Sequence, residues 1–341
     1  MTSTARRRWS RELTTEIDGI ACGSEGPVLI HGYDRPPGGK WLDDVIPGKL
    51  GALDRNSGET LWMAPCEVGY GRGFGAGFGA LGQAVVLGPS VAGHRMVRMS
   101  LENGELLEAA DIPPFDEAHV ASDMCLCVAA QRVFGIDSLT LGEAWDYARE
   151  GERYHNVIRA GDRALVLYTD QQTGYQGILA LDAETGGFEG IVLPPALPIV
   201  HGLATTADTL LILTSDLERV LPAEQIGPFK SLIATHEDGG ARDTLSLLAL
   251  RVDNQPGDDP LWYRILETRK LDDLPEVSIS ADSGKLYLER SAFLEAADAV
   301  TGRALGEWTV PGLDEQIGWS VVQGAGLLAE ETRVSMFELP A

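Results

Sequence analysis

Residues 52–62 of this 341-residue chain read A-L-D-R-N-S-G-E-T-L-W, and this stretch decides the fold. A short apolar strand leads into Asp54, a Ser-Gly turn follows, and a second strand ends on Trp62. An aspartate at this position accepts backbone N–H groups across a tight turn, and glycine adopts the positive φ that most residues avoid. The tryptophan offers a large apolar face. The stretch therefore predicts a hairpin that packs against a neighbouring sheet.

Imperfect copies of this hairpin recur along the chain. Residues 180–186 read A-L-D-A-E-T-G, residues 296–302 read A-A-D-A-V-T-G, and residues 134–145 form a looser copy that ends on Trp145. Each copy closes a unit with room for four short strands, and repeats of about 40 residues are typical of propellers. We therefore predict an all-β fold, a seven-bladed β-propeller that forms one domain over residues 1–341.

The expected blades follow one another along the chain and span residues 16–63, 72–108, 117–147, 155–191, 200–265, 276–310 and 316–339. The fifth blade carries an insertion at residues 215–243. The last blade supplies three strands, and residues 8–13 have the length and character of the missing outer strand. An N-terminal strand in this place would close the ring and protect its edges. A six-bladed ring would leave this segment without a partner.

The charge balance is acidic, with 51 acidic and 27 basic residues and a formal net charge of −24. Because nucleic-acid binding requires a basic surface, we expect no nucleic-acid partner. The longest apolar runs have the length of strands and fall short of the roughly 20 residues of a membrane helix, so we expect no membrane partner. Three arginines (Arg6, Arg7 and Arg8) are followed by no apolar signal region, which favours a cytoplasmic protein. The acidity suits a basic protein partner, or it reflects the composition of the host's proteins.

The four cysteines are too few for a disulfide framework. Cys125 and Cys127 are two residues apart and would share one face of a strand. We interpret them as a buried pair of small apolar side chains, with a metal or redox pair as the alternative.

The pattern A-x-D-x-x-[ST]-G, followed by an aromatic residue, resembles the repeat of the quinoprotein-like (PQQ-type) β-propellers. Residues 52–62 carry it fully, and the copies at residues 180–186 and 296–308 carry it in part. The resemblance covers most of the chain and implies how the blades are built. The quinone-binding dehydrogenases of this family are exported and much longer, and they carry two adjacent cysteines at the cofactor. This chain lacks these features, so PQQ is not an expected cofactor. Non-catalytic relatives use the same blades as docking surfaces.

Candidate functional residues lie where the first strand of each blade begins. In a propeller these strands line the central channel, and their beginnings share a face with the connections between the second and third strands. The residues at these positions are, in chain order, Glu16, Arg72, His119, His155, His201, Glu276 and Gln316. Three of the six histidines thus occupy equivalent positions in consecutive blades, so we predict that they converge near one mouth.

Three neutral imidazoles with open coordination positions suit a divalent zinc, iron or manganese ion. In this hypothesis His119, His155 and His201 bind the metal, and Glu16, Glu276 and Arg72 act as catalytic groups, the carboxylates as further ligands or a general base. The chain would then be a metal-dependent lyase or oxygenase. Two alternatives remain open: structural histidines that lock the loops, and a ligand site without a metal.

The same face collects the two largest expected connections, residues 34–47 and 215–243. Extended loops on one face of a rigid scaffold are where partners and ligands bind. Our first hypothesis is therefore a cytoplasmic docking module that binds a protein or a small molecule through this loop-rich face, and the acidic surface favours a basic protein. The metal-dependent enzyme is the alternative, and the identity of any cofactor stays open.

Overall fold

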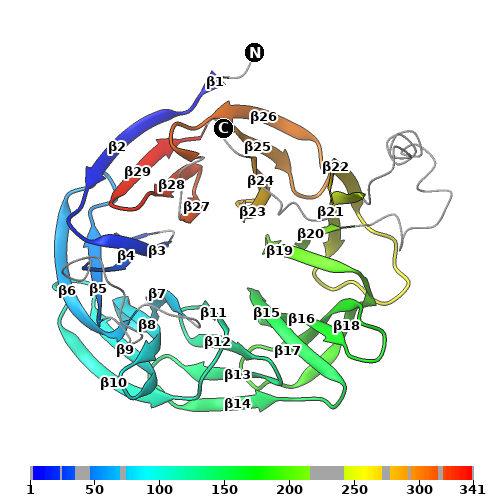
Figure 1. Ribbon diagram of the computed structural model, residues 1–341, viewed down its shortest axis with the longest axis horizontal. Helices are drawn as coiled ribbons and strands as arrows, with labels where there is room; N and C mark the ends of the chain where they lie inside the picture. Colours follow the sequence, from blue (N-terminus) through cyan, green and yellow to red (C-terminus); the bar gives the residue numbers. More distant parts are fainter. Residues whose placement is uncertain are drawn as a thin grey trace.

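The computed structural model describes residues 3–23, 25–34, 47–69, 74–215, 242–270, 277–290, 293–313 and 318–339. In these ranges the strands form seven sheets arranged in a ring (Figure 1). The protein is a seven-bladed β-propeller, as predicted. Its one described helical turn is η1 (Ala80–Gly82). No helix within the described ranges is long and apolar enough to cross a membrane.

Five blades are built alike, with four strands in chain order from the centre of the ring outwards (Figure 1). Blade 1 contains β3 (Glu16–Cys22), β4 (Val28–Tyr33), β5 (Pro47–Leu53) and β6 (Thr60–Gly69). Blade 2 contains β7 (Gly75–Gly79), β8 (Gln83–Ser90), β9 (Gly93–Ser100) and β10 (Leu106–Ile112). Blade 3 contains β11 (Glu117–Val120), β12 (Met124–Ala129), β13 (Arg132–Asp137) and β14 (Glu143–Tyr147). Blade 4 contains β15 (Glu152–Ala160), β16 (Arg163–Asp170), β17 (Gln176–Asp182) and β18 (Phe188–Leu197). Blade 5 contains β19 (Ile199–Thr205), β20 (Thr209–Ser215), β21 (Arg242–Arg251) and β22 (Trp262–Lys270).

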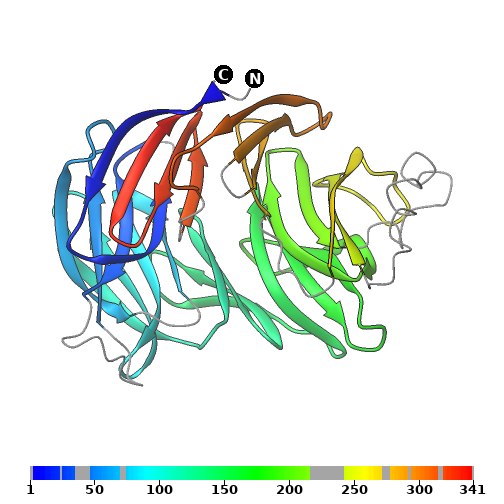
Figure 2. The ribbon, with the colours of Figure 1, turned by 45° about the horizontal axis from the view of Figure 1, so that its top comes forward.

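The N-terminal segment completes the two remaining blades. Blade 7 contains β27 (Gly318–Val322), β28 (Ala325–Ala329) and β29 (Arg333–Glu338), and β2 (Arg6–Glu12) pairs antiparallel with β29. This confirms the predicted closure of the ring by an N-terminal strand. Blade 6 contains β23 (Val277–Asp282), β24 (Lys285–Arg290), β25 (Phe293–Asp298) and β26 (Ala304–Thr309). Sequence reasoning missed β1 (Ser3–Thr4), which pairs parallel with β26 (Figure 2). The first residues therefore tie blade 6 to blade 7.

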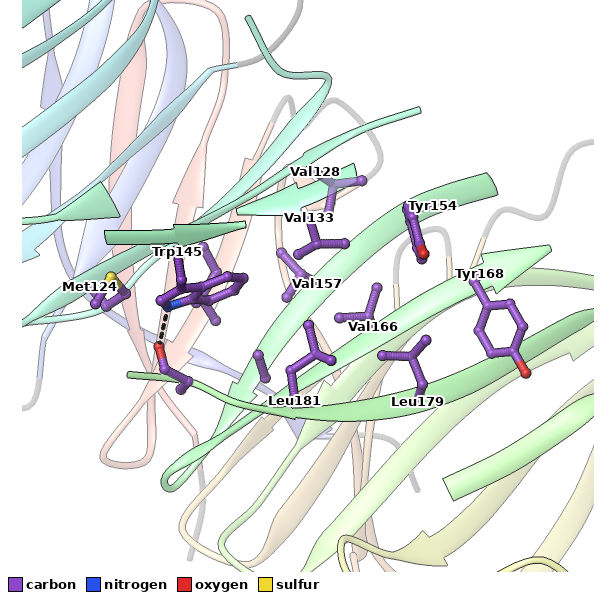
Figure 3. Packing of buried hydrophobic residues seen from close by; sticks show 13 residues of the cluster. Met124, Val128, Val133, Trp145, Tyr154, Val157, Val166, Tyr168, Leu179 and Leu181 are labelled. Atoms are coloured by element: carbon purple, nitrogen blue, oxygen red, sulfur yellow. Dashed lines mark hydrogen bonds between the residues drawn. The ribbon is translucent and has the colours of Figure 1, made fainter. Parts of the chain in front are cut away.

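The core consists of apolar clusters packed between neighbouring sheets. Between blades 3 and 4, for example, Val128 and Val133 pack with Val166 and Leu179 (Figure 3). Cys125 and Cys127 lie in the cluster between blades 2 and 3, fully buried and free. Burial raises the pKa of the Cys125 thiol to about 12, which makes it unreactive at neutral pH. The interpretation of this pair as small apolar side chains is confirmed.

The stretch at residues 52–62 joins one blade to the next. Oδ1 of Asp54 accepts hydrogen bonds from the backbone N–H of Asn56 at 3.0 Å and of Ser57 at 2.8 Å, which closes the turn. The Trp62 side chain extends from blade 1 to blade 2, where its indole N–H donates to the carbonyl of Leu101 at 2.8 Å. Figure 3 shows the same contact between Trp145 of blade 3 and the Ala183 carbonyl of blade 4. The motif therefore stabilises both the hairpin and the packing between blades.

Blade junctions without such a tryptophan are joined in other ways. Between blades 2 and 3, the turn of blade 3 carries Leu141 at the glycine position, with a φ of 55°. Its side chain is 3% exposed and packs in the cluster between these two blades, where it fills the space that an indole takes elsewhere. Between blades 4 and 5 the direction is reversed, since the Asn254 amide of blade 5 donates to the carbonyl of Val192 in blade 4.

Candidate functional site

The candidate site lies where the innermost strands begin. Each of these beginnings is paired with the end of the second strand of its blade, as Glu16 with Tyr33 and Ile199 with Ser215 show. We call this end of the ring the loop-rich face and the opposite end, which carries the Asp54-type turns of the third and fourth strands, the turn face. The expected placement of His119, His155 and His201 on innermost strands (β11, β15 and β19) is observed.

Two of these histidines occupy β-bulges. In β15, Tyr154 pairs with Tyr168 and Asn156 pairs with Leu167, so His155 is an extra residue without a partner in the ladder. His201 is the extra residue of β19 in the same way. A bulge re-aims the side chain of the extra residue. The bulge therefore decides where each imidazole points. The alternating pattern of a regular strand, read from the sequence, does not predict such a bulge.

Both re-aimed imidazoles bind a hydroxyl group on the second strand of their own blade. The Nε2 atom of His155 lies 2.7 Å from Oγ1 of Thr169, and the Nε2 atom of His201 lies 2.7 Å from Oγ of Ser215. Ser215 is only 1% exposed, so a substrate could not reach its hydroxyl as a nucleophile. These bonds tie the first strand to the second at the loop-rich face. The arrangement agrees with the alternative of structural histidines that lock the ends of the blades.

Blade 1 contains a related pair that sequence reasoning missed. Asp18 is the extra residue of a bulge in β3, and its carboxylate accepts a 2.5 Å hydrogen bond from Nδ1 of His31 in β4. The His31 side chain is fully buried and packs against Phe74, with ring centroids 4.1 Å apart and the ring planes tilted by 34°. In blade 6, Ser278 donates to the Glu289 carboxylate at 2.5 Å. Polar pairs between first and second strands thus recur in four blades, with different residue types.

Burial shifts four titratable groups near this face towards their neutral forms. It lowers the pKa of His119 and of His155, and the charges of Arg159 and Arg153 respectively lower these values further. Burial also raises the pKa of two carboxyl groups, Glu117 and Glu289. Removing a charged group from water favours its neutral form in each case. Burial therefore favours the neutral forms of these four hydrogen-bonding groups relative to the same groups in water.

The predicted convergence on a metal ion is not observed among the described residues. Within them, no three side chains of His, Cys, Asp or Glu are placed to hold one ion. The physical reason is that His155 and His201 are bonded to hydroxyls of their own blades, while His119 sits in a blade whose first strand has no bulge. Glu16 begins β3 and is buried at 8% exposure. Arg72, Glu276 and Gln316 lie outside the described residues.

One further turn on this face carries a sequence pattern that could have been recognised. Residues 170–174 read D-Q-Q-T-G, the same Asp-x-x-Thr-Gly pattern that marks the turns between third and fourth strands. Here it connects the second and third strands of blade 4, so it lies on the loop-rich face. Counting this pattern without regard to its place in the repeat would have found it.

Comparisons with known proteins establish the fold. No protein-family model and no curated protein matches the sequence. BamB from Moraxella catarrhalis is similar in structure, with a TM-score of 0.52 and 11% identity over 95% of this chain and 85% of that one. The Neurospora crassa Pan2 WD40 domain gives 0.58 and 9% over 99% and 98%. Kuenenia stuttgartiensis hydrazine synthase gives 0.60 and 8% over 96% of each chain. At these identities the likeness shows a β-propeller, and the resemblance to the quinoprotein-like repeat stays a prediction.

Proposed function

We propose that this propeller is a docking module that binds a protein partner through its loop-rich face. The β-propeller is commonly a scaffold for protein interactions, and the WD40 domain among the similar structures is consistent with that use. The proposal for this particular face rests on described residues of blades 4 and 5.

The observation that carries the proposal is a pair of exposed apolar side chains on adjoining blades. Tyr175, which directly follows the Asp170 turn of blade 4, is 41% exposed, and Ile199 at the start of β19 is 51% exposed. The Gln176 side chain accepts a 2.6 Å hydrogen bond from the N–H of Val200, which holds the two blade ends together. Exposed Arg153 is the second residue of β15, the innermost strand of blade 4. Tyrosine and arginine are enriched where proteins bind one another.

The two faces of the ring contribute differently to its rigidity. On the turn face, the tryptophans are docked on the turns of the next blade and hold the ring together. On the loop-rich face, the strand ends are fixed from within by the His155 and His201 pairs. A surface that is rigid before binding loses less entropy on binding. The formal charge of −24 favours a basic partner, because opposite charges steer encounter.

The experiment compares two surface double variants. Tyr175→Ser/Ile199→Ser removes the apolar pair of the loop-rich face, and Leu106→Ser/Leu305→Ser removes two equally exposed leucines at the beginnings of β10 and β26, next to the turn face. A partner captured from the host's extract and then purified should bind the first variant at least about tenfold more weakly, or 1.4 kcal/mol, and the second as tightly as the wild type. Equal affinity for the wild type and the loop-rich-face variant would refute the proposed face.

No observation on the described residues favours the metal-dependent lyase or oxygenase. His155 and His201 each have a hydroxyl partner, and the described residues contain no group of three or more potential metal ligands. We therefore propose the docking function alone.

A further inference from the structure

Four turns on the turn face hold a tryptophan in one common way. The turns begin at Asp54, Ser100, Asp182 and Asp298, and the indole N–H of Trp9, Trp62, Trp145 and Trp262 respectively donates to the carbonyl of the next residue, at 2.8 to 3.1 Å. The fifth residue of each turn is a glycine with φ between 68° and 73° (Gly58, Gly104, Gly186 and Gly302). A Cβ atom on these glycines would lie only 2.5 to 2.7 Å from the ring. Each turn is thus a flat seat for one indole.

The turn at Asp170 reproduces this seat on the loop-rich face. Oδ1 of Asp170 accepts the N–H groups of Gln172 and Thr173, both at 2.8 Å, and the N–H of Gly174 donates to the Asp170 carbonyl at 2.8 Å. Gly174 has a φ of 75°. The N–H of Gln171 donates to the Gly151 carbonyl of the adjacent connection, as the N–H of Ala183 does to Asp162 in the Asp182 turn of the same blade. Backbone and anchoring are therefore the same as in a docked turn.

The Asp170 turn differs from the others because no indole of the described residues occupies it. No atom of the described residues lies within 4 Å of a Cβ atom placed on Gly174, and this glycine is exposed, whereas Gly58, Gly104 and Gly186 are buried beneath their rings. Among the described residues, no hydrogen bond reaches the carbonyl of Gln171, which corresponds to the carbonyls that accept the indole N–H elsewhere. The preceding connection, residues 148–151 (A-R-E-G), contains no aromatic residue that could fill the seat.

We propose that the Asp170 turn is the seat for a tryptophan of the partner protein. The indole would stack on Gly174 and donate its N–H to the Gln171 carbonyl, next to exposed Tyr175. Phenylalanine could stack but could not donate, and the donor of tyrosine lies at the far end of its ring. This inference deepens the docking function proposed above and rests on it, and the charge of the chain favours a tryptophan flanked by lysine or arginine.

The test uses a peptide that copies the docking strand of this protein. The probe is acetyl-Lys-Thr-Leu-Trp-Lys-amide, which repeats residues 60–62 between two lysines, and the matched probe carries leucine in place of tryptophan. Amide chemical shifts of the ¹⁵N-labelled full chain report binding. We expect the shifts of Gln171, Gly174 and Tyr175 to saturate at millimolar peptide, and the leucine probe to bind at least about tenfold more weakly.

Matched glycine variants keep the test decisive. In Gly174→Ala the new methyl group occupies the space of the ring, so the shifts should disappear. Gly284→Ala has the same geometry, with a φ of 77° and nothing within 4 Å, but no Asp-x-x-Thr-Gly turn, so the shifts should persist. The proposal is overturned if these amides do not respond, if both probes bind equally, or if Gly174→Ala leaves binding intact. A partner that still binds Gly174→Ala but loses affinity for the Tyr175→Ser/Ile199→Ser variant refutes the tryptophan seat alone and leaves the docking function standing.

Discussion

Docking of Trp145 on Gly186 should couple the two residues energetically, and Gly174 provides the matched reference. Both glycines are the fifth residue of an Asp-x-x-Thr-Gly turn, with φ of 69° and 75°. A Cβ atom on Gly186 would lie 2.6 Å from Trp145, while a Cβ atom on Gly174 would meet nothing within 4 Å. An alanine at either position carries the strain of a left-handed backbone, about 1–2 kcal/mol. Only the alanine at position 186 also displaces a packed ring.

The expected costs follow from these two contributions. Gly174→Ala should lower the free energy of unfolding by about 1–2 kcal/mol. Gly186→Ala should lower it by a further 1–3 kcal/mol, roughly the usual cost of overpacking a core. Trp145→Ala, which removes a side chain that is 92% buried (8% exposed), should cost about 3–5 kcal/mol. In the Trp145→Ala background, Gly186→Ala should again cost only about 1–2 kcal/mol, because no ring remains to be displaced.

Urea unfolding of the wild type and the four variants can be followed by far-ultraviolet circular dichroism, whose signal comes mainly from the backbone. The double-mutant cycle isolates the contact between residues 145 and 186. Equal costs for Gly186→Ala and Gly174→Ala would refute the reasoning. So would a cost of Gly186→Ala that is the same with and without Trp145. Either result would mean that the glycine serves the turn alone and not the packing between blades.

Three further predictions concern the locks of the ring. Burial lowers the pKa of His155 in the folded state, so the contribution of this residue to stability is complete above the unfolded value of about 6.5 and is lost as the pH falls through the lowered folded pKa. Urea unfolding of His155→Gln should therefore show a smaller loss of stability between pH 7 and pH 5 than unfolding of the wild type. An equal loss of stability would contradict the burial argument. Deletion of residues 1–12 exposes the edge of β29 and should lower the midpoint of thermal unfolding far more than deletion of residues 1–4, which removes β1 alone. Similar midpoints for the two deletions would show that β2 does not hold the ring closed. Leu141→Gly relieves the strain of a φ of 55° but removes a side chain that is only 3% exposed. We expect urea unfolding to show a net loss of about 1–3 kcal/mol in the free energy of unfolding. A gain in stability would mean that backbone strain outweighs packing at this position.

The fold could be predicted from the sequence because its signals are local. All the bonds of the Asp54 turn lie within six residues, so the pattern A-x-D-x-x-[ST]-G specifies a hairpin wherever it occurs. The number of blades follows from the count of units of about 40 residues, several of which end in this turn, and the three-stranded last unit requires an N-terminal strand. The parallel strand β1 escaped prediction because two residues, Ser3 and Thr4, carry no periodicity.

The candidate site was predictable only in part. The positions of His119, His155 and His201 on innermost strands followed from the count of strands. Their directions did not, because a one-residue bulge at His155 and at His201 turns each imidazole onto a hydroxyl of the second strand. The Asp18–His31 pair likewise depends on a bulge and on the register between β3 and β4.

By itself the sequence determined the hairpins, their number and the residue types at the two faces, since these depend on short-range hydrogen bonds and on strand periodicity. Only the tertiary structure decided which turn receives a tryptophan. Trp62 and Leu101 are 39 residues apart, and their contact exists only because one blade is placed against the next. The turn at Asp170 has the same local sequence as a docked turn, but within the described ranges the closed ring brings no tryptophan against it.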